Sequence, residues 1–366
     1  MVSLRFSFLT AVCCLIIIGA FILSCSDDDR QPTAPTKEYS WSPLGIGLNG
    51  SVACVAVYSE VLFVGGGFTT TGSVSVNHIA GWDADSVSWF QLGSGTSGPV
   101  WALTPRGTYL IVGGRFMTAG DSSASNIAGW NLNYGWWSWW DGMNDWVTVL
   151  TEYNDRLIAA GFFTAANGVS ANHIAVTVDY GASWGPLGTG LNDYGRALTV
   201  FDGKLVAGGD FSTAGGAAAN HVAAWDGSSW TPLGAGLNGR VFALTVYDNK
   251  LIAGGEFTGS GGVSVSHIAI WDGTSWTPLG TGMNDNVFAL TVYDGRLIAG
   301  GNFVTAGGVN ANHIAAWNGS SWAPLGVGTD GGVNCLGIYN DTLIVGGSFT
   351  TAGGASANNI AAWGPK

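Results

Sequence analysis

Histidine is the side chain of this sequence best suited to metal binding or proton transfer, and its five copies share one setting. Each stands directly before an Ile-Ala or Val-Ala pair: His78, His173, His221, His267 and His313. Imidazole is a common zinc ligand and a general base near neutral pH. The recurrence therefore indicates either a metal or catalytic set or a structural position that repeats with the fold, and the spacing of the repeats has to decide.

Tryptophan marks the elements that must position these side chains. Seven copies recur at steps of 46 to 48 residues: Trp41, Trp89, Trp136, Trp184, Trp230, Trp276 and Trp322. A period of about 40 to 50 residues is typical of propellers and solenoids. One unit, residues 230–275, divides into four short β-patterned runs, and the first two meet at a two-residue turn. The turn dipeptides suit a tight hairpin: Asn154-Asp155, Asp202-Gly203, Asp248-Asn249 and Asp294-Gly295.

The phase of the repeats predicts a closed ring. The chain begins with a lone fourth strand at 41–45 and ends after a lone third strand at 358–363. Pairing these two strands would hide a sheet edge that is otherwise open to aggregation. The sequence therefore predicts an all-β fold, a seven-bladed β-propeller of four-stranded antiparallel blades, with N-terminal strand 41–45 completing the last blade.

The repeats also resemble known families. The second strand ends in a double glycine in six copies: Gly65-Gly66, Gly113-Gly114, Gly208-Gly209, Gly254-Gly255, Gly300-Gly301 and Gly346-Gly347, with Ala160-Gly161 in the remaining copy. This pattern resembles kelch-type propellers. The motif HIAxWDGxxWxPLGxGL resembles the repeats of the cortical cell-polarity marker family and of similar bacterial surface lipoproteins. The resemblance covers 41–363 and implies a fold and a tendency to mediate contacts.

One repeat carries a second resemblance. Residues 177–184, TVDYGASW, resemble the Asp-box of sialidases and other propellers. In those proteins the box is a structural hairpin between outer strands, remote from the catalytic centre. The resemblance therefore implies propeller geometry and does not by itself imply sialidase activity.

Ring geometry separates the histidines. On the third strand they would lie at a radius of roughly 16 Å, with neighbouring copies roughly 14 Å apart. Ligands of one zinc lie ~2 Å from the metal. Asn126 and Asn359 take the same position in the other two repeats. We therefore expect a structural role for this position, and neither a metal nor a cofactor is predicted.

Two cysteines within the repeats share one position. Cys54 and Cys335 stand where other first strands carry Ala102, Ala243 or Ala289, in the blades that meet at closure. Equivalent side chains point the same way around the ring, whereas a disulfide needs Cβ atoms ~3.8 Å apart. Two buried thiols acting as small apolar residues are the favoured interpretation. A disulfide stays open as the alternative.

Positions that vary against a constant background are the candidate binding site. The residue after the double glycine and the residue opening the first strand both differ from blade to blade, and both should lie near the channel mouth. The candidate ligand-binding residues are Arg115, Trp146, Tyr194, Asp210, Arg240, Glu256, Asn286 and Asn302. Their rings and charges suit a sugar or peptide site. The alternative is a solvated loop face that nothing constrains.

Two carboxylates among these candidates raise the possibility of catalysis. Asp210 and Glu256 occupy equivalent positions in adjacent blades, about 10 Å apart, near or beyond the spacing of inverting glycosidases. Arg115, Arg196 and Arg240 are the arginines that can face the mouth. A carbohydrate-active enzyme, hydrolase or lyase-like, using Asp210, Glu256 and Arg240 is therefore the second hypothesis, but no catalytic residue is assigned.

A tryptophan-rich stretch, residues 134–146, suggests a second surface. Trp137, Trp139 and Trp140 replace residues that are Thr, Leu and Gly in other copies. Aromatic residues at an outer edge are typical of a partner or glycan surface, and local packing is the alternative.

The N-terminal segment indicates export. An apolar run leads to Ser24 and Cys25, and Ile22-Leu23-Ser24-Cys25 resembles the bacterial lipobox, which implies acylation of Cys25. We expect residues 1–24 to be a lipoprotein-type signal peptide, 25–40 a flexible acidic and proline-containing tether, and 41–366 one propeller domain. An uncleaved membrane anchor is the alternative.

Composition narrows the partners. The formal net charge is -12 and only 10% of residues are charged, so the chain lacks the basic footprint of a nucleic-acid-binding protein. We expect a non-catalytic extracytoplasmic binding propeller at the bacterial envelope, outer membrane or cell surface. Its partner would be a protein or glycan, and it would meet the membrane through the lipid anchor only. The third hypothesis is a structural envelope protein.

Overall fold

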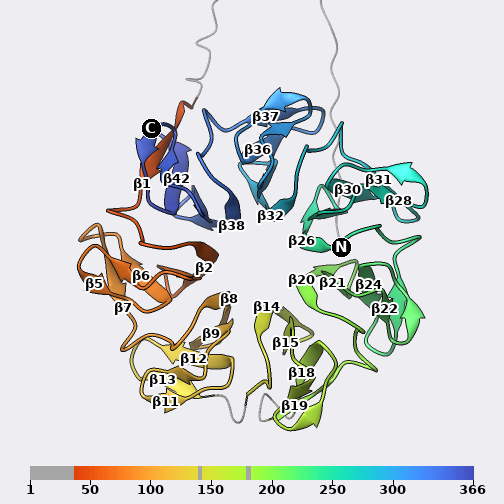
Figure 1. The fold of residues 1–366 in the computed structure, drawn as a ribbon, viewed down its shortest axis with the longest axis horizontal. Helices are drawn as coiled ribbons and strands as arrows, with labels where there is room; N and C mark the ends of the chain where they lie inside the picture. The colour runs from red at the N-terminus through yellow and green to blue at the C-terminus, as the bar shows by residue number, and fades with distance from the viewer. Residues whose placement is uncertain (1–36, 139–141, 179–182) are drawn as a thin grey trace, which may run out of the picture. The chain divides into compact units, whose positions relative to one another are not determined.

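The computed structural model describes residues 37–138, 142–178 and 183–366, and its regular elements are all β-strands. The compact unit Glu38–Lys366 contains every strand of these residues. Seven four-stranded antiparallel sheets surround a central channel as blades, each with its first strand innermost (Figure 1). The predicted all-β, seven-bladed propeller is confirmed.

Each blade follows the chain from the channel outward. Blade 1 contains β2 (Val52–Tyr58), β3 (Val61–Gly66), β6 (Ile79–Asp83) and β7 (Ser88–Gln91). Blade 2 contains β8 (Val100–Arg106), β9 (Tyr109–Gly114), β12 (Ile127–Asn131) and β13 (Gly135–Ser138). Blade 3 contains β14 (Val147–Tyr153), β15 (Arg156–Gly161), β18 (Ile174–Val178) and β19 (Ser183–Pro186). Blade 4 contains β20 (Gly195–Phe201), β21 (Lys204–Gly209), β24 (Val222–Trp225) and β25 (Trp230–Pro232).

The last three blades repeat this order. Blade 5 contains β26 (Val241–Tyr247), β27 (Lys250–Gly255), β30 (Ile268–Trp271) and β31 (Trp276–Pro278). Blade 6 contains β32 (Val287–Tyr293), β33 (Arg296–Gly301), β36 (Ile314–Trp317) and β37 (Trp322–Pro324). Blade 7 contains β38 (Val333–Tyr339), β39 (Thr342–Gly347), β42 (Ile360–Pro365) and, from the other end of the chain, β1 (Tyr39–Pro43).

Blade 7 closes the ring as predicted, with a small shift in bounds. Strand β1 pairs with β42, so that Trp41 lies opposite Trp363, and it begins two residues before the expected 41–45. It ends at Pro43 because the chain then turns: Gly45 has a φ of +60° and the Leu44 carbonyl accepts a hydrogen bond from Trp89 Nε1. An ion pair of 3.0 Å between Lys366 Nζ and Glu38 Oε2 fastens the two ends.

The hairpin turns between first and second strands follow the predicted turn chemistry. In the four predicted dipeptides both residues have φ between 49° and 70°. Asn, Asp and Gly tolerate this left-handed region better than other residues do. The turns therefore form where the sequence predicts them.

The loop between the second and third strands carries a small hairpin that the sequence analysis did not predict. These hairpins are β4 (Thr70–Thr71) with β5 (Val74–Ser75), β10 (Thr118–Ala119) with β11 (Ser122–Ser123), β16 (Ala165–Ala166) with β17 (Val169–Ser170), β22 (Thr213–Ala214) with β23 (Ala217–Ala218), β28 (Gly259–Ser260) with β29 (Val263–Ser264), β34 (Thr305–Ala306) with β35 (Val309–Asn310), and β40 (Thr351–Ala352) with β41 (Ala355–Ser356). The loop that enters each blade is tied to the hairpin: Asn238 Oδ1, for example, accepts the backbone N–H groups of Thr258 and Gly259 at 2.8 Å. The loop face is thus rigidly braced.

The hydrophobic core is divided among the seven interfaces between blades, with one buried cluster at each. The repeat tryptophan joins neighbouring blades there. In six copies its Nε1 donates to the carbonyl of a leucine that follows the outer strand of the preceding blade, at 2.7 to 3.1 Å: Trp41 to Leu325, Trp89 to Leu44, Trp136 to Leu92, Trp230 to Leu187, Trp276 to Leu233 and Trp322 to Leu279. These bonds explain the tryptophan period.

The double glycine is required by close backbone approach. A Cβ on the first glycine would lie 2.4 to 2.6 Å from the valine that opens the inner strand of the next blade, and a Cβ on the second would lie 2.0 to 2.2 Å from a carbonyl of its own blade. Blade 3, which lacks the first glycine, shows a compensating change in blade 4. Ala160 replaces the first glycine of blade 3, and the facing position of blade 4 is Gly195 instead of valine. A Cβ on Gly195 would lie 2.7 Å from the Cβ of Ala160.

Candidate functional site

The two variable positions predicted to lie at the channel mouth are neighbours in every blade. The residue after the double glycine donates its backbone N–H to the carbonyl of the residue that opens the first strand, at 2.8 to 3.0 Å: Gly67 to Ser51, Arg115 to Pro99, Phe162 to Trp146, Asp210 to Tyr194, Glu256 to Arg240, Asn302 to Asn286 and Ser348 to Gly332. One constant backbone frame therefore presents seven different side-chain pairs. We call these fourteen residues the rim.

A third variable position, which the sequence analysis missed, lies next to the rim. Every inner strand has a register shift after its first residue, which leaves one bulged residue facing the channel side. The bulged residues are Ala53, Trp101, Thr148, Arg196, Phe242, Phe288 and Asn334. Bulges re-aim side chains and are frequent beside functional sites. One pattern in the sequence could have identified this position. It differs from blade to blade, although in most blades the residue before it is valine and the residue after it is small.

Rim and bulge side chains together line a pocket of about 550 Å³ at the mouth. We call it the mouth pocket. Its lining residues are Ala53, Trp101, Trp146, Thr148, Phe162, Arg196, Arg240, Phe242 and Phe288. The volume falls within the roughly 300–1,000 Å³ typical of small-molecule sites. A second cavity of about 210 Å³, which shares Arg196, Phe242 and Phe288 with the mouth pocket, is lined by side chains of the inner strands.

Aromatic rings form a continuous wall on one side of the mouth pocket. Trp101 meets Trp146 edge to face, with ring centroids 4.9 Å apart. Trp146 packs on Phe162 at 4.8 Å, and Phe162 stacks on Tyr194 at 3.7 Å with an interplanar angle of 17°. The rings come from three successive blades. Because each ring is held by its neighbours, the wall is pre-organised for contact with a flat apolar surface.

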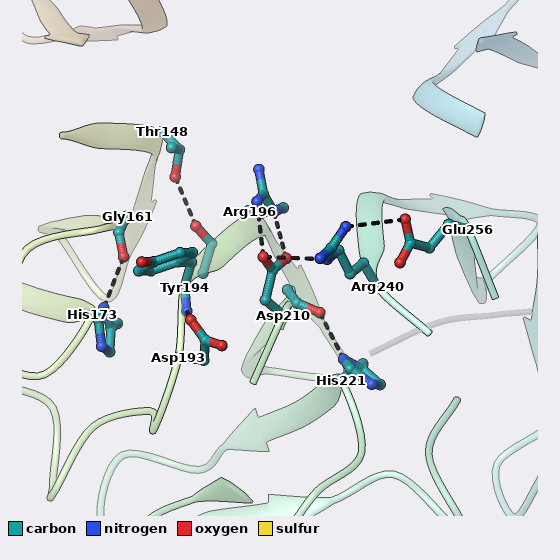
Figure 2. A network of polar contacts seen from close by, with 12 residues as sticks. Thr148, Gly161, His173, Asp193, Tyr194, Arg196, Asp210, His221, Arg240 and Glu256 are labelled. Carbon is teal, nitrogen blue, oxygen red and sulfur yellow. Dashed lines mark hydrogen bonds and ion pairs between the residues drawn. The ribbon is translucent and has the colours of Figure 1, made fainter. Parts of the chain in front are cut away.

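A series of alternating charges, Arg196, Asp210, Arg240 and Glu256, begins beside Tyr194, the last ring of this wall (Figure 2). Arg196 donates hydrogen bonds to both carboxylate oxygens of Asp210, from Nε to Oδ1 and from Nη2 to Oδ2, the latter at 2.8 Å. Arg240 Nε lies 3.4 Å from Asp210, and Arg240 Nη1 lies 3.3 Å from Glu256. The side chain of Asp210 is 9% exposed, that of Glu256 34% and that of Arg240 50%. Arg240 is thus the most exposed of these charged side chains.

The guanidinium groups also cover aromatic faces. Arg115 lies over the ring of Trp146, with Cζ 4.4 Å from the ring centroid. Arg196 lies between Phe162 and Phe242, at 5.6 and 5.7 Å. Such contacts are favourable because the ring faces carry partial negative charge. Arginine side chains of the protein itself therefore occupy faces of Trp146, Phe162 and Phe242.

The arrangement of the two carboxylates bears on the enzyme hypothesis. Arg240 stands between Asp210 and Glu256 and contacts both. A glycosidase pair has to flank a scissile bond with space for sugar, and for water in the inverting case. Here the Arg240 guanidinium lies between the two carboxylates.

The other predicted site residues are dispersed. Asn286 and Asn302 sit on the rim of blade 6 but do not line the mouth pocket. Trp137 is 43% exposed and packs on Tyr109, with centroids 5.5 Å apart. Trp139, Trp140 and Cys25 lie outside the described residues. The flanks of the Asp-box stretch pair as outer strands, with Thr177 opposite Trp184, while 179–182 also lie outside the described residues.

The histidine position is part of the frame. In all seven blades this residue has a φ between 62° and 72°, a region in which Asn and His are enriched among residues with a side chain. Its N–H and C=O both bond within the blade, and in His173, His221 and His267 the Nδ1 atom lies 3.1 to 3.2 Å from the carbonyl of the second glycine. Burial lowers the pKa of His78. Within the described residues, no three His, Cys, Asp or Glu side chains are grouped so as to hold a metal ion.

Both cysteines of the repeats are free thiols rather than a disulfide. Burial raises the pKa of Cys54 well above its usual value and raises that of Cys335 to about 12. Buried neutral thiols are poor nucleophiles. The favoured interpretation as small apolar residues fits this environment.

Comparison with known proteins supports the fold. Residues 202–223 and 294–315 match a family described as "Domain of unknown function (DUF5122) beta-propeller". Comparison with curated proteins gave no match in sequence. The structure is similar to the WD40 beta propeller domain of Doa1, with a TM-score of 0.59 and 15% identity over 90% of this chain and 97% of that chain. It is also similar to the computationally designed Ika8 protein, with a TM-score of 0.52 and 16% identity over 88% of this chain and 99% of that chain.

These similarities show the β-propeller fold alone, so any argument about function has to start from the residues of the candidate site. Among residues 37–138, 142–178 and 183–366, no helix has the length and apolar character needed to cross a membrane. The mouth pocket combines volume, aromatic surface and charge with lining residues that differ from blade to blade.

Proposed function

We propose that this protein is a non-catalytic binding propeller that holds its ligand in the mouth pocket. One observation carries the proposal: nine side chains from the positions that differ from blade to blade line a single pocket of about 550 Å³. Rigid scaffolds with variable loop-face residues are a common basis for recognition. The repeated residues hold the frame, and the varied residues provide the contacts.

Binding is favoured over catalysis by the ion-pair chain. Asp210 already accepts hydrogen bonds from Arg196 at both oxygens, and Arg240 occupies the space between Asp210 and Glu256. These contacts bind both oxygens of Asp210 and one oxygen of Glu256 to arginine side chains. The same rigid network positions Arg240 for a ligand.

We further propose that the propeller works outside the cytoplasm, tethered through acylated Cys25. Support comes from the apolar run that ends at Ser24-Cys25, and from the resemblance of the repeats to kelch-type propellers, to the cell-polarity marker family and to bacterial surface lipoproteins. Labelling with radioactive palmitate should mark the wild type and not Cys25→Ala. Equal labelling of the two would refute the anchor.

The binding proposal is tested with residues 38–366, the unit that contains the complete ring. The purified unit is applied to arrays of glycans, cell-wall polymers and peptides, alongside Trp101→Ala. We expect retention of at least one ligand class by the wild type and loss of that ligand in the variant. If the wild type retains nothing, a structural envelope role replaces the binding role.

A further inference from the structure

We infer that the mouth pocket selects an acidic glycan, an oligosaccharide whose uronic acid residues carry carboxylates. The inference rests on the proposed binding function and names the ligand class for that site. It follows from three features of the described residues: the charge that the pocket presents, the cations that already cover its rings, and the use of backbone groups at its rim.

The pocket presents positive charge although the chain is acidic. The charged residues that line the pocket are Arg196 and Arg240, and half of the Arg240 side chain is exposed, whereas its partners Asp210 and Glu256 are 9% and 34% exposed. Arg115 is exposed on the rim and forms no ion pair within the described residues. A ligand entering the mouth therefore meets guanidinium groups first, and these bind carboxylates well because their planar donors match two oxygens. The net charge of -12 disfavours non-specific attraction of anions, so selectivity has to come from the pocket.

The aromatic lining does not favour a cationic ligand. Aromatic cages bind quaternary ammonium groups through open ring faces. Here Arg115 covers a face of Trp146, and Arg196 lies between Phe162 and Phe242. An incoming cation would have to displace these groups and would be repelled by them. A neutral or anionic ligand is not repelled by these groups, and Trp101 and Phe288 leave it rings that no guanidinium of the described residues covers.

The rim favours a sugar over a peptide main chain. Peptides that dock on β-proteins commonly use free backbone donors and acceptors. At this rim the N–H of Phe162 bonds to Trp146 O, that of Asp210 to Tyr194 O and that of Glu256 to Arg240 O, so these groups are already paired. At these three positions the rim therefore offers a ligand its side chains.

Rings and guanidinium groups suit the two ends of one sugar residue. Trp101 and Phe288 line the pocket and, among the described residues, carry no guanidinium over their rings, so they offer stacking surface for the apolar face of a pyranose. Arg240 lines the same pocket and is placed to receive a ring carboxylate. A uronic acid residue carries both groups.

The test compares acidic oligosaccharides with their own methyl esters. Calorimetric titration of the 38–366 unit uses oligomers of galacturonic, glucuronic and mannuronic acid, each beside the ester that removes only the charge. We expect one acid to bind at least about ten-fold more tightly than its ester, since a charge-assisted hydrogen bond is lost. Arg240→Gln should weaken binding of the acid about ten-fold and leave the ester unchanged. Arg240→Lys should retain part of the preference.

Arg296→Gln is the matched control. Arg296 is exposed to a similar degree, 46%, and pairs with Asp294 at a hairpin turn away from the mouth pocket. This variant should bind like the wild type, and circular dichroism confirms that each variant folds. Trp101→Ala should weaken binding of acid and ester alike.

The possible failures are distinguishable. Equal binding of an acid and its ester, with loss in Trp101→Ala, overturns the acidic preference and leaves the binding function standing. Retention of peptides instead of glycans at the same pocket overturns the glycan assignment alone. Absence of binding to every acid, while another array ligand is retained, also overturns the inference. Absence of all binding overturns the proposed function with it.

Discussion

The interfaces between blades and the channel mouth use the same inner strands in opposite ways. At the interfaces six tryptophans make the same hydrogen bond to the preceding blade, and at six of the seven interfaces a double glycine meets the valine that opens the next inner strand. At the mouth the bulged position passes from Ala53 to Trp101 to Arg196 on an unchanged backbone.

The contrast shows which constraint acts where. At an interface a new Cβ strikes a neighbouring blade or a carbonyl, so the side chain is fixed by space. At the mouth the backbone bonds are complete before any side chain is chosen, so its identity is free to serve recognition. The predictions below test this division, and the expected loss of folding stability decreases from one to the next.

The largest effect is expected at the second glycine of a blade. In Gly255→Ala the new Cβ would lie 2.0 Å from the carbonyl oxygen of Arg240, which is backbone and cannot rotate away. We expect the free energy of unfolding to fall by about 3 kcal/mol, measured by urea denaturation. Gly185→Ala is the control, because its nearest contact is an ordinary 3.5 Å to Val178. A loss in Gly255→Ala no greater than in the control would contradict the steric account.

The interface between blades 3 and 4 offers a double-mutant cycle. Gly195→Val should lower stability by about 1–3 kcal/mol, because it adds a side chain against Ala160. Adding Ala160→Gly recreates the glycine–valine pair of the other blades. We expect a favourable coupling of about 1–2 kcal/mol between the two changes. Simple additivity would show that the two positions are independent and that the pairing in the sequence is incidental.

The repeat tryptophan should show a moderate effect. Trp276→Phe removes the bond to Leu233 O, which then keeps only the N–H of Gly236, and the loss of this contact between blades should lower stability by about 1–2 kcal/mol. The Trp101 side chain makes no hydrogen bond between blades within the described residues, so Trp101→Phe at the mouth should cost about 0.5 kcal/mol. Similar losses in thermal unfolding experiments would remove the distinction between the two regions.

The smallest effect at neutral pH is expected for the two thiols. Replacing Cys54 and Cys335 by alanine, the residue of several other blades, should change stability by no more than about 1 kcal/mol at pH 7. Burial raises the folded-state pKa of Cys335 to about 12, so above pH 9 the unfolded chain loses protons that the folded chain retains. Stability should therefore fall as pH rises from 9 toward 12, and less steeply in the double variant. Identical alkaline profiles would contradict the burial of these thiols.

The sequence predicts the frame well because the frame is local or periodic. Turn dipeptides such as Asp248-Asn249 carry their own backbone preference, and the 46-to-48-residue step sets the number of blades. The phase of the ends predicts closure, although β1 (Tyr39–Pro43) lies two residues earlier than expected. The rim positions could be predicted because their residues differ from blade to blade, whereas the flanking residues are nearly constant.

The site itself is less predictable, since it depends on contacts between blades. The bulge at Arg196 is a register shift between paired strands, and no residue type in the sequence requires it. The position of Arg240 between Asp210 and Glu256 joins two repeats through long side chains with several rotamers. The interchange of histidine and asparagine, by contrast, was readable: both tolerate the positive φ that the position requires.

The most direct test removes the aromatic side chains at three bulge positions of the mouth pocket and leaves the interfaces between blades unchanged. Trp101→Ala, Phe242→Ala and Phe288→Ala together give three blades the bulge residue that blade 1 already has in Ala53. The measurement is the array binding profile of this variant beside that of the wild-type unit 38–366. The account predicts a folded variant that loses the ligand retained by the wild type. A folded variant with an unchanged profile would contradict the assignment of binding to the mouth pocket.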